Sequence, residues 1–181
     1  MTTDGNRHVS PYTTREKIAR VLWSMAQATL FRFSFHNCYG WRRFVLRCFG
    51  ATIGRSCVIR RTVRVECPWN LTMSDNACLG DRVHAYCLGT VVIGRRVSIS
   101  QDAELCAGSH DYSKQDMPLL RPPIVIEDDV WIAAGAFVGP GVTIGEGAVL
   151  GARGVAMKDL QSWSIYVGNP AARIRERHRP S

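Results

Sequence analysis

The residues best suited to chemistry lie on either side of an interruption in a regular pattern. His110 immediately precedes the aperiodic segment 111–123, and Trp131 follows soon after it. An imidazole beside a sheltering loop can accept a proton from a hydroxyl or an amine near neutral pH. The sequence has no G-x-S-x-G motif, and Cys106 has no activating neighbour, so no covalent nucleophile is indicated. A surface or core histidine without a catalytic role is the alternative interpretation.

The pattern that is interrupted repeats every six residues. Small or aliphatic residues recur at this spacing over roughly 53–110 and 124–158, and glycine often follows them. The series are Ile53, Ile59, Val65, Leu71 and Ala77; Leu79 and Ala85; Ile93, Ile99 and Leu105; and Ile126, Ile132, Val138, Ile144, Leu150 and Ala156. A helix or an ordinary strand has a different period. The spacing therefore predicts short strands joined by tight turns, stacked as an all-β solenoid of triangular coils.

The segments outside the repeat are expected to cap this solenoid. We predict a disordered N-terminus at 1–13, a helical cap at 14–48, a parallel β-helix at 49–160 with a loop extruded at 111–123, and a C-terminal extension at 161–181 that runs back along the coils. The amphipathic helix at about 14–35 either covers the first coil or lies on a membrane surface. No run of 18 apolar residues occurs.

Composition narrows the partners and the compartment. The 181 residues are 46% hydrophobic with a formal charge of +8, which suits one domain with an anionic partner, or serves solubility alone. No interleaving of aromatic and basic residues supports binding to nucleic acid, and none is expected. The seven cysteines form no CxxC pair, and the polar first 14 residues do not resemble a signal peptide. We therefore expect free thiols, no metal and a cytoplasmic location.

Longer motifs make the chain resemble the hexapeptide-repeat acetyltransferases. They are FGATIG (49–54), PWNL (68–71), AYCLG (85–89), VVIGRRVSISQDAELCAGSHDY (91–112), VWIAAGAFVGPGVTIGEGAVLGA (130–152) and VGNPA (167–171). PWNL and CAGSHDY together resemble the colanic acid biosynthesis group, with maltose and galactoside O-acetyltransferases as more distant relatives. The resemblance implies a left-handed β-helix and a homotrimer with the site between subunits. It also implies direct transfer from acetyl-CoA, a co-substrate rather than a tightly bound cofactor, to a saccharide, which can be lipid- or nucleotide-linked.

The resemblance also implies roles for individual residues. His110 is the general base, and its orienting partner is left open among Asp81, Asp102, Glu104, Asp111 and a backbone carbonyl. The residues expected to bind acetyl-CoA are Trp131, Ala133, Ala134, Gly135, Ala152, Arg153, Met157, Lys158, Arg173 and Arg175. The residues expected to bind the acceptor are Asp81, His84, Tyr86 and Cys87. Relatives often read GNPAK where this chain reads GNPAAR, so Arg173 is expected to replace the missing lysine charge.

Several other functions fit the same scaffold. The chain could N-acetylate an amino sugar, use another acyl donor, or serve as a β-helix that only binds a ligand. A serine acetyltransferase would need a long N-terminal helical domain, and a γ-type carbonic anhydrase would need three histidines where the repeats offer His84 and His110. A peripheral contact with the inner membrane through the N-terminal helix is left open.

Overall fold

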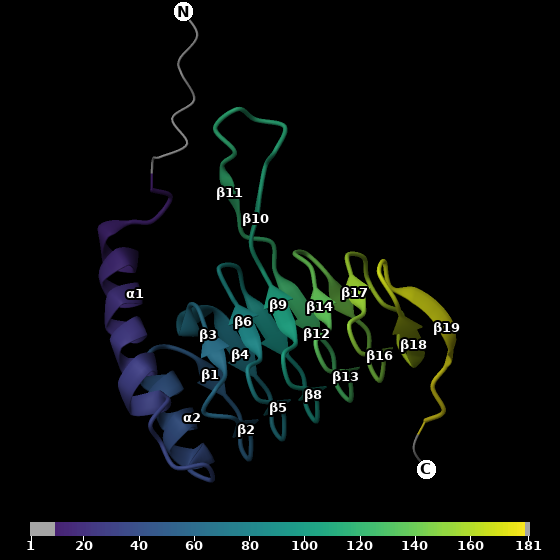
Figure 1. The fold of residues 1–181 in the computed structure, drawn as a ribbon, viewed down its shortest axis with the longest axis horizontal. Coiled ribbons are helices and arrows are strands. Elements are labelled where there is room, and N and C mark those ends of the chain that lie inside the picture. The colour runs from purple at the N-terminus through teal and green to yellow at the C-terminus, as the bar shows by residue number, and fades with distance from the viewer. Residues whose placement is uncertain (1–9, 180–181) are drawn as a thin grey trace, which may run out of the picture.

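The computed structural model describes residues 10–179, which form a triangular prism of stacked strands with helices at one end (Figure 1). The helices are α1 (Thr14–Ala26), the π-helix η1 (Gln27–Phe31), α2 (Tyr39–Cys48) and the 3-10 turn η2 (Pro68–Asn70). Each face of the prism is one sheet. Sheet A contains β1 (Thr52–Ile53), β4 (Leu71–Met73), β7 (Val91–Ile93), β12 (Ile124–Ile126) and β15 (Thr143–Ile144).

The other two faces complete each coil. Sheet B contains β2 (Val58–Ile59), β5 (Cys78–Leu79), β8 (Ser98–Ile99), β13 (Trp131–Ile132), β16 (Val149–Leu150), β18 (Ser164–Val167) and β19 (Ala172–Glu176). Sheet C contains β3 (Arg64–Val65), β6 (His84–Tyr86), β9 (Glu104–Cys106), β14 (Phe137–Val138) and β17 (Val155–Ala156). Within these three sheets, neighbouring strands are parallel except β18 and β19. The predicted left-handed parallel β-helix is confirmed.

One residue of each short strand points into the prism, and these residues stack into columns. In sheet B the column is Ile59, Leu79, Ile99, Ile132 and Leu150, each no more than 1% exposed. Because each coil buries its column only against its neighbours, the core is continuous along the whole axis. The six-residue spacing predicted this column correctly.

The sequence alone misplaced one slip of the repeat. It indicated a shift after Ala77, but Ala77 is buried at a corner in phase with the coils around it. The slips occur instead where the chain passes from sheet C to sheet A, which we call the C–A corner. There the chain inserts η2 (Pro68–Asn70), then residues 87–90, and then the long segment 107–123. Extra length at one corner leaves the stacking of the three sheets unchanged.

Helix α1 covers the open edge of sheet C. The indole nitrogen of Trp23 donates to the carbonyl oxygen of Val65 at 2.7 Å. The Gln27 Oε1 atom accepts from the backbone N–H of the same Val65, also at 2.7 Å. The N–H and C=O groups of Val65, at the open edge of β3, are thereby satisfied. This protects an edge that would otherwise pair with another chain.

Helix α2 covers the open edges of sheets A and B through arginines. Arg42 donates from Nε to the Ile59 carbonyl oxygen at 2.6 Å, and Arg43 donates to the Cys57 carbonyl oxygen at 2.8 Å. Arg47 donates to the Ile53 carbonyl oxygen at 3.0 Å. Helix α2 falls within the helical cap predicted at 14–48, but the pattern indicated only the helix at about 14–35, because Arg42 occupies the buried stripe of α2 in place of an apolar residue.

The two ends of the chain differ from expectation in detail. Residues 1–9 of the segment predicted to be disordered lie outside the described residues, whereas Thr13 caps α1 in a capping box with Glu16. At the other end, β18 adds a further parallel strand and β19 folds back antiparallel on it. Arg177 reaches back along the coils, donating to the carbonyl oxygen of Gly147 at 2.9 Å. The extension therefore caps the last coil.

Within residues 10–179, no helix is both long and apolar enough to cross a membrane.

Candidate active site

His110 lies in the stem of a hairpin that projects from the C–A corner (Figure 1). Strand β10 (Ser109–His110) pairs antiparallel with β11 (Leu119–Leu120), which places His110 opposite Leu119. The hairpin base fits closely against the preceding coil, because a Cβ atom at Gly89 would lie 2.6 Å from the carbonyl oxygen of Arg121. The scaffold thus fixes the backbone of His110 while its side chain stays exposed.

A backbone carbonyl orients the His110 imidazole. Its Nδ1 atom lies 2.7 Å from the carbonyl oxygen of Met117, across the hairpin. A carbonyl oxygen only accepts, so Nδ1 carries the proton and Nε2 keeps its lone pair. The four carboxylates considered from sequence are engaged elsewhere: Asp81 with Thr62, Asp102 with Arg82, Glu104 with His84 and Asp111 with Ser113.

The tip of the hairpin is held by its own hydrogen bonds. The Asp111 carboxylate accepts from the Ser113 hydroxyl at 2.5 Å and from the Ser113 backbone N–H at 3.1 Å, and these bonds lower the pKa of Asp111. The backbone N–H of Met117 donates to the Lys114 carbonyl at 3.1 Å. Met117 has a positive φ of 44°, which is uncommon outside glycine and is sustained only by its surroundings. This turn presents the Met117 carbonyl to His110.

Trp131 lies on the outer face of sheet B and is 47% exposed. Its indole Nε1 donates to the Ser100 hydroxyl at 3.0 Å, which holds the ring against the face. Strand pairing places Trp131, Val149, Ile165 and Arg175 in one outward row across four neighbouring strands. At the usual strand spacing, Trp131 and Arg175 are roughly 14 Å apart.

The small residues expected to bind acetyl-CoA stack at the corner between sheets B and C. Ala133 is 6% exposed, and its N–H donates to the Leu150 carbonyl. The N–H groups of Gly135 and Arg153 also donate to neighbouring coils. These amides hold the coils together and are therefore not available to pantetheine. Ala134 is half-buried and Ala152 is exposed, so their side chains border the outer surface.

The remaining residues expected to bind acetyl-CoA fall in two separate places. Met157 and Lys158 lie at the C–A corner, beyond the hairpin along the axis, and both are exposed. Arg173 and Arg175 lie on β19 at the end of sheet B. Arg173 donates to the Ser164 hydroxyl at 3.0 Å and pairs with Glu176 at 3.2 Å. Arg175, in the outward row of Trp131, is the better placed of the two.

Three of the four expected acceptor residues border sheet C. Asp81 lies at a corner and accepts from Thr62 at 2.7 Å. His84 and Tyr86 lie side by side on the outer face of β6, with ring centroids 5.6 Å apart. Cys87 instead points inward and is 0% exposed, and burial raises its thiol pKa to about 12. Its side chain belongs to the core.

His84 is the more unusual of the outward groups on sheet C. Its Nδ1 lies 3.5 Å from Glu104, one strand further along, while its Nε2 is buried without a hydrogen-bond partner among the described residues. Burial lowers the pKa of His84, and the Glu104 carboxylate partly opposes that shift. A neutral imidazole on this face can serve as a hydrogen-bonding group for a polar ligand.

Sequence reasoning missed two groups that orient the site. The Met117 carbonyl is a main-chain group, so no residue type in the sequence indicates its role. Ser100 could have been found by aligning the repeat across the loop. That alignment pairs Trp131 with Ser98 and Ile132 with Ile99, so Ser100 lies close to Trp131 on the preceding coil. Over the described part of the chain, no three His, Cys, Asp or Glu side chains come close enough to hold a metal ion.

A single chain does not bring His110 and Trp131 together. The hairpin leaves the C–A corner, and in a triangular prism that corner lies opposite sheet B, which carries Trp131. Figure 1 shows the hairpin projecting on one side of the prism and β8 and β13 on the other. One chain thus presents two separate groups of candidate residues.

The repeated coils and the six-residue pattern define a hexapeptide-repeat transferase. The sequence signature described as Bacterial transferase hexapeptide (six repeats) matches residues 123–155. The chain is 48% identical over 156 residues to the "Putative colanic acid biosynthesis acetyltransferase WcaF" of Escherichia coli (strain K12), covering 86% of each protein. The chain therefore belongs to this family of hexapeptide-repeat acetyltransferases and is an acyltransferase.

Two solved structures share the fold at lower sequence identity. A maltose O-acetyltransferase from Clostridium difficile 630 superposes with a TM-score of 0.81 at 22% identity, covering 98% of this chain and 99% of that one. A galactoside acetyltransferase in complex with coenzyme A superposes with a TM-score of 0.68 at 21% identity, covering 93% and 86%. At this identity the likeness concerns the fold.

Proposed function

We propose that this acetyltransferase transfers the acetyl group of acetyl-CoA to a sugar hydroxyl during synthesis of an exopolysaccharide, with His110 as general base. The observation that carries the proposal is the 2.7 Å bond between His110 Nδ1 and the Met117 carbonyl oxygen. It fixes the tautomer in which Nε2 can accept a proton, on an exposed stem where an acceptor can reach it. The family and the acetyl-CoA co-substrate of its structural neighbours are consistent with this role.

The reaction needs two proton transfers, one from the acceptor hydroxyl to His110 and one from His110 to the CoA thiolate. Nε2 of His110 takes the proton of the acceptor hydroxyl as its oxygen attacks the thioester carbonyl carbon. The tetrahedral intermediate then collapses, the C–S bond breaks, and the imidazolium returns the proton to the departing CoA thiolate. General base catalysis of this kind contributes about 10²–10⁴-fold. No acetyl-enzyme forms, and positioning of the two substrates supplies much of the remaining rate.

The proposed enzyme is a homotrimer. The base at the C–A corner and the proposed donor-binding row on sheet B face away from each other within one chain. A cyclic arrangement of three triangular solenoids places the C–A corner of one chain against sheet B of the next. Each site would then take His110 from one subunit, and Trp131 and Arg175 from its neighbour.

The proposed acceptor site lies on the outer face of sheet C. His84, Tyr86 and Glu104 offer hydrogen-bonding groups beside an aromatic ring, a combination that suits a saccharide. The acceptor can be free, nucleotide-linked or lipid-linked. We place the enzyme in the cytoplasm, because its seven free thiols suit a reducing compartment.

The test is acetyl-CoA-dependent thiol release over sugars, amino sugars, nucleotide sugars and lipid-linked oligosaccharides. One hydroxyl acceptor should raise turnover above hydrolysis, and His110→Ala should lower it about 10²-fold or more. His178→Ala, an exposed histidine after β19, is the matched control. Preference for an amine acceptor would instead establish N-acetylation, and failure to bind acetyl-CoA would favour a binding scaffold.

A further inference from the structure

The helical cap has two faces, and only its inner face is accounted for by the solenoid. Trp23, Ala26 and Phe31 point inward and are buried. The outward side chains are unusually apolar, and Phe33 and Phe35 are 82% and 84% exposed. The exposed apolar residues of the cap are Ile18, Val21, Leu22, Met25, Leu30, Phe33, Phe35, Trp41 and Phe44. We call this set the apolar platform.

The outer sides of η1 and α2 meet within the platform. The Trp41 indole of α2 donates to the Leu30 carbonyl oxygen of η1 at 2.8 Å, which ties the helices together on their outer side. The Trp41 and Phe44 rings lie 5.8 Å apart. A groove of about 470 Å³ opens between Trp41 and the chain around Phe33 and Phe35. Contiguous exposed surface of this kind usually marks an interaction site.

The charge around the platform is almost entirely positive. Residues 14–48 contain seven arginines or lysines and one acidic residue, Glu16. Four of the seven are engaged with the solenoid (Arg20, Arg42, Arg43 and Arg47), whereas Arg15, Lys17 and Arg32 are exposed. Glu16 is already paired with Arg121 at 3.0 Å. A partner that covers the platform must therefore tolerate or neutralise this charge.

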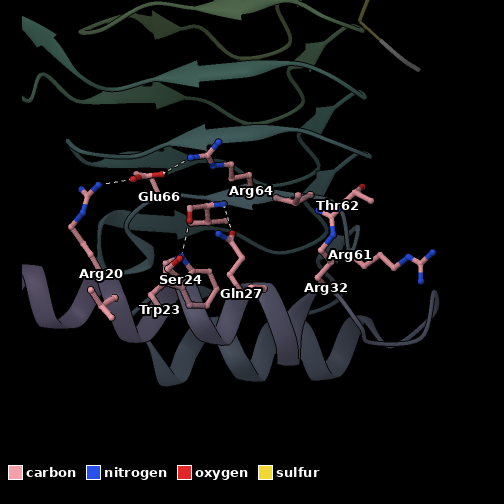
Figure 2. A pocket seen from close by; sticks show the side chains of 13 residues that line it. Arg20, Trp23, Ser24, Gln27, Arg32, Arg61, Thr62, Arg64 and Glu66 are labelled. Carbon is pink, nitrogen blue, oxygen red and sulfur yellow. Dashed lines mark hydrogen bonds and ion pairs between the residues drawn. The ribbon is translucent and has the colours of Figure 1, made fainter.

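A second groove, bordered by several charged side chains, runs between α1 and the edge of sheet C. Figure 2 shows its lining, in which Arg20 forms a 2.6 Å ion pair with Glu66. Arg32 and Arg61 line the same groove, and neither has a carboxylate partner within residues 10–179. Val21 of the platform lies at its rim. Unpaired guanidinium groups beside an apolar surface suit phosphate groups adjoining hydrocarbon.

We propose that the apolar platform docks the protein on an anionic lipid bilayer, with Phe33, Phe35 and Trp41 entering the interface and Arg32 and Arg61 contacting lipid phosphates. Charge favours this occupant over a second copy of the chain, because two platforms face to face would juxtapose the same positive groups. Exposed aromatic side chains with flanking arginines are typical of helices that lie in the membrane interface. The inference does not depend on the proposed acetyl transfer.

The test is co-sedimentation of the full chain with vesicles of phosphatidylcholine alone, or with about 30% phosphatidylglycerol. We expect binding to the anionic vesicles only, falling about tenfold or more in the double variant Phe33→Ser/Phe35→Ser. Both positions are exposed, so folding should be retained, as checked by thermal unfolding. Ile174→Ser is the matched control, because Ile174 is 55% exposed on β19 at the opposite end of the solenoid.

Three results would overturn the proposal. The wild type could stay in solution with both kinds of vesicle, or the double variant could bind as well as the wild type. Alternatively, light scattering could show that the double variant loses mass relative to the wild type, which would identify another copy of the chain as the occupant. Acetyl transfer to a soluble acceptor, measured in parallel, keeps these outcomes separate from any failure of the proposed activity.

Discussion

His110 and Trp131 lie on opposite sides of one solenoid. His110 stands on a hairpin from the C–A corner, and Trp131 projects from sheet B, the face opposite that corner. The hairpin stem and the coil are both fixed by backbone pairing, so no side-chain rotation brings the two residues together. If both act on one acetyl group, they must come from different subunits.

Inactive variants should therefore complement each other. His110→Ala and Trp131→Ala are each expected to have little activity alone. When the two chains are co-expressed in equal amounts and assemble at random as trimers, about a quarter of the sites pair an intact His110 with an intact Trp131. Thiol release should recover to about that fraction of wild type.

The control for this experiment is a mixture of the two separately purified variants without subunit exchange, which should stay inactive. If co-expressed chains remain as inactive as their parents while mixed trimers are demonstrated, then His110 and Trp131 do not serve a shared site.

Arg175 is expected to contribute more to the binding of acetyl-CoA than Arg173 does. Arg175 shares the outward row of Trp131, whereas Arg173 is occupied by Ser164 and Glu176. Arg175→Gln should raise KM for acetyl-CoA about tenfold with kcat nearly unchanged, because a phosphate contact stabilises the ground state and the transition state equally. Arg173→Gln is the matched comparison. Steady-state kinetics that show the larger KM effect at Arg173 would reverse the assignment.

The sequence predicted the scaffold better than it predicted the groups that orient the site. A period of six follows directly from short strands and tight turns, so the inward column of sheet B was visible as a run of aliphatic residues. The Met117 carbonyl was not visible in this way, because its direction depends on the Asp111 turn and on pairing across the hairpin.

The motifs also did not indicate which atoms at the expected binding positions are engaged in the core or in the stacking of coils. The N–H groups at Ala133 and Gly135 are consumed by the stacking of coils, and Cys87 faces inward. Motif resemblance identifies positions along the chain, but it does not indicate which of their atoms are already hydrogen-bonded or buried within the fold. Helix α2 lies within the helical cap predicted at 14–48 but was not distinguished as a separate helix, because the buried arginine on its inner stripe resembles a surface residue in sequence.

Arg42 is expected to be the most sensitive residue of the cap. It is 0% exposed and donates to the carbonyl oxygens of Ile59, Phe35 and His36, and burial lowers its pKa. Arg42→Met leaves these acceptors unpaired and should lower the free energy of unfolding by about 3 kcal/mol. Denaturant unfolding at fixed protein concentration measures this, since assembly contributes to stability.

Arg43→Met provides the comparison for Arg42. Arg43 makes a single bond to the Cys57 carbonyl and is only half-buried, so its loss should cost about 1 kcal/mol. Equal losses in the free energy of unfolding at the two positions would mean that the carbonyl groups under Arg42 are hydrogen-bonded to water in the variant.

His84 should make stability depend on pH in the acidic range. Burial lowers its pKa below the ordinary value of 6.5, so the unfolded chain binds the proton more readily than the folded chain does. This contribution is complete above about pH 6.5 and is lost as the pH falls from there toward the lower pKa of the folded state. His84→Gln keeps a polar side chain but does not titrate. Between about pH 7.5 and pH 5.5, the variant should lose less stability than the wild type in urea unfolding. Parallel losses in the two proteins would show that His84 is solvated in the folded state and that its buried Nε2 has found a partner.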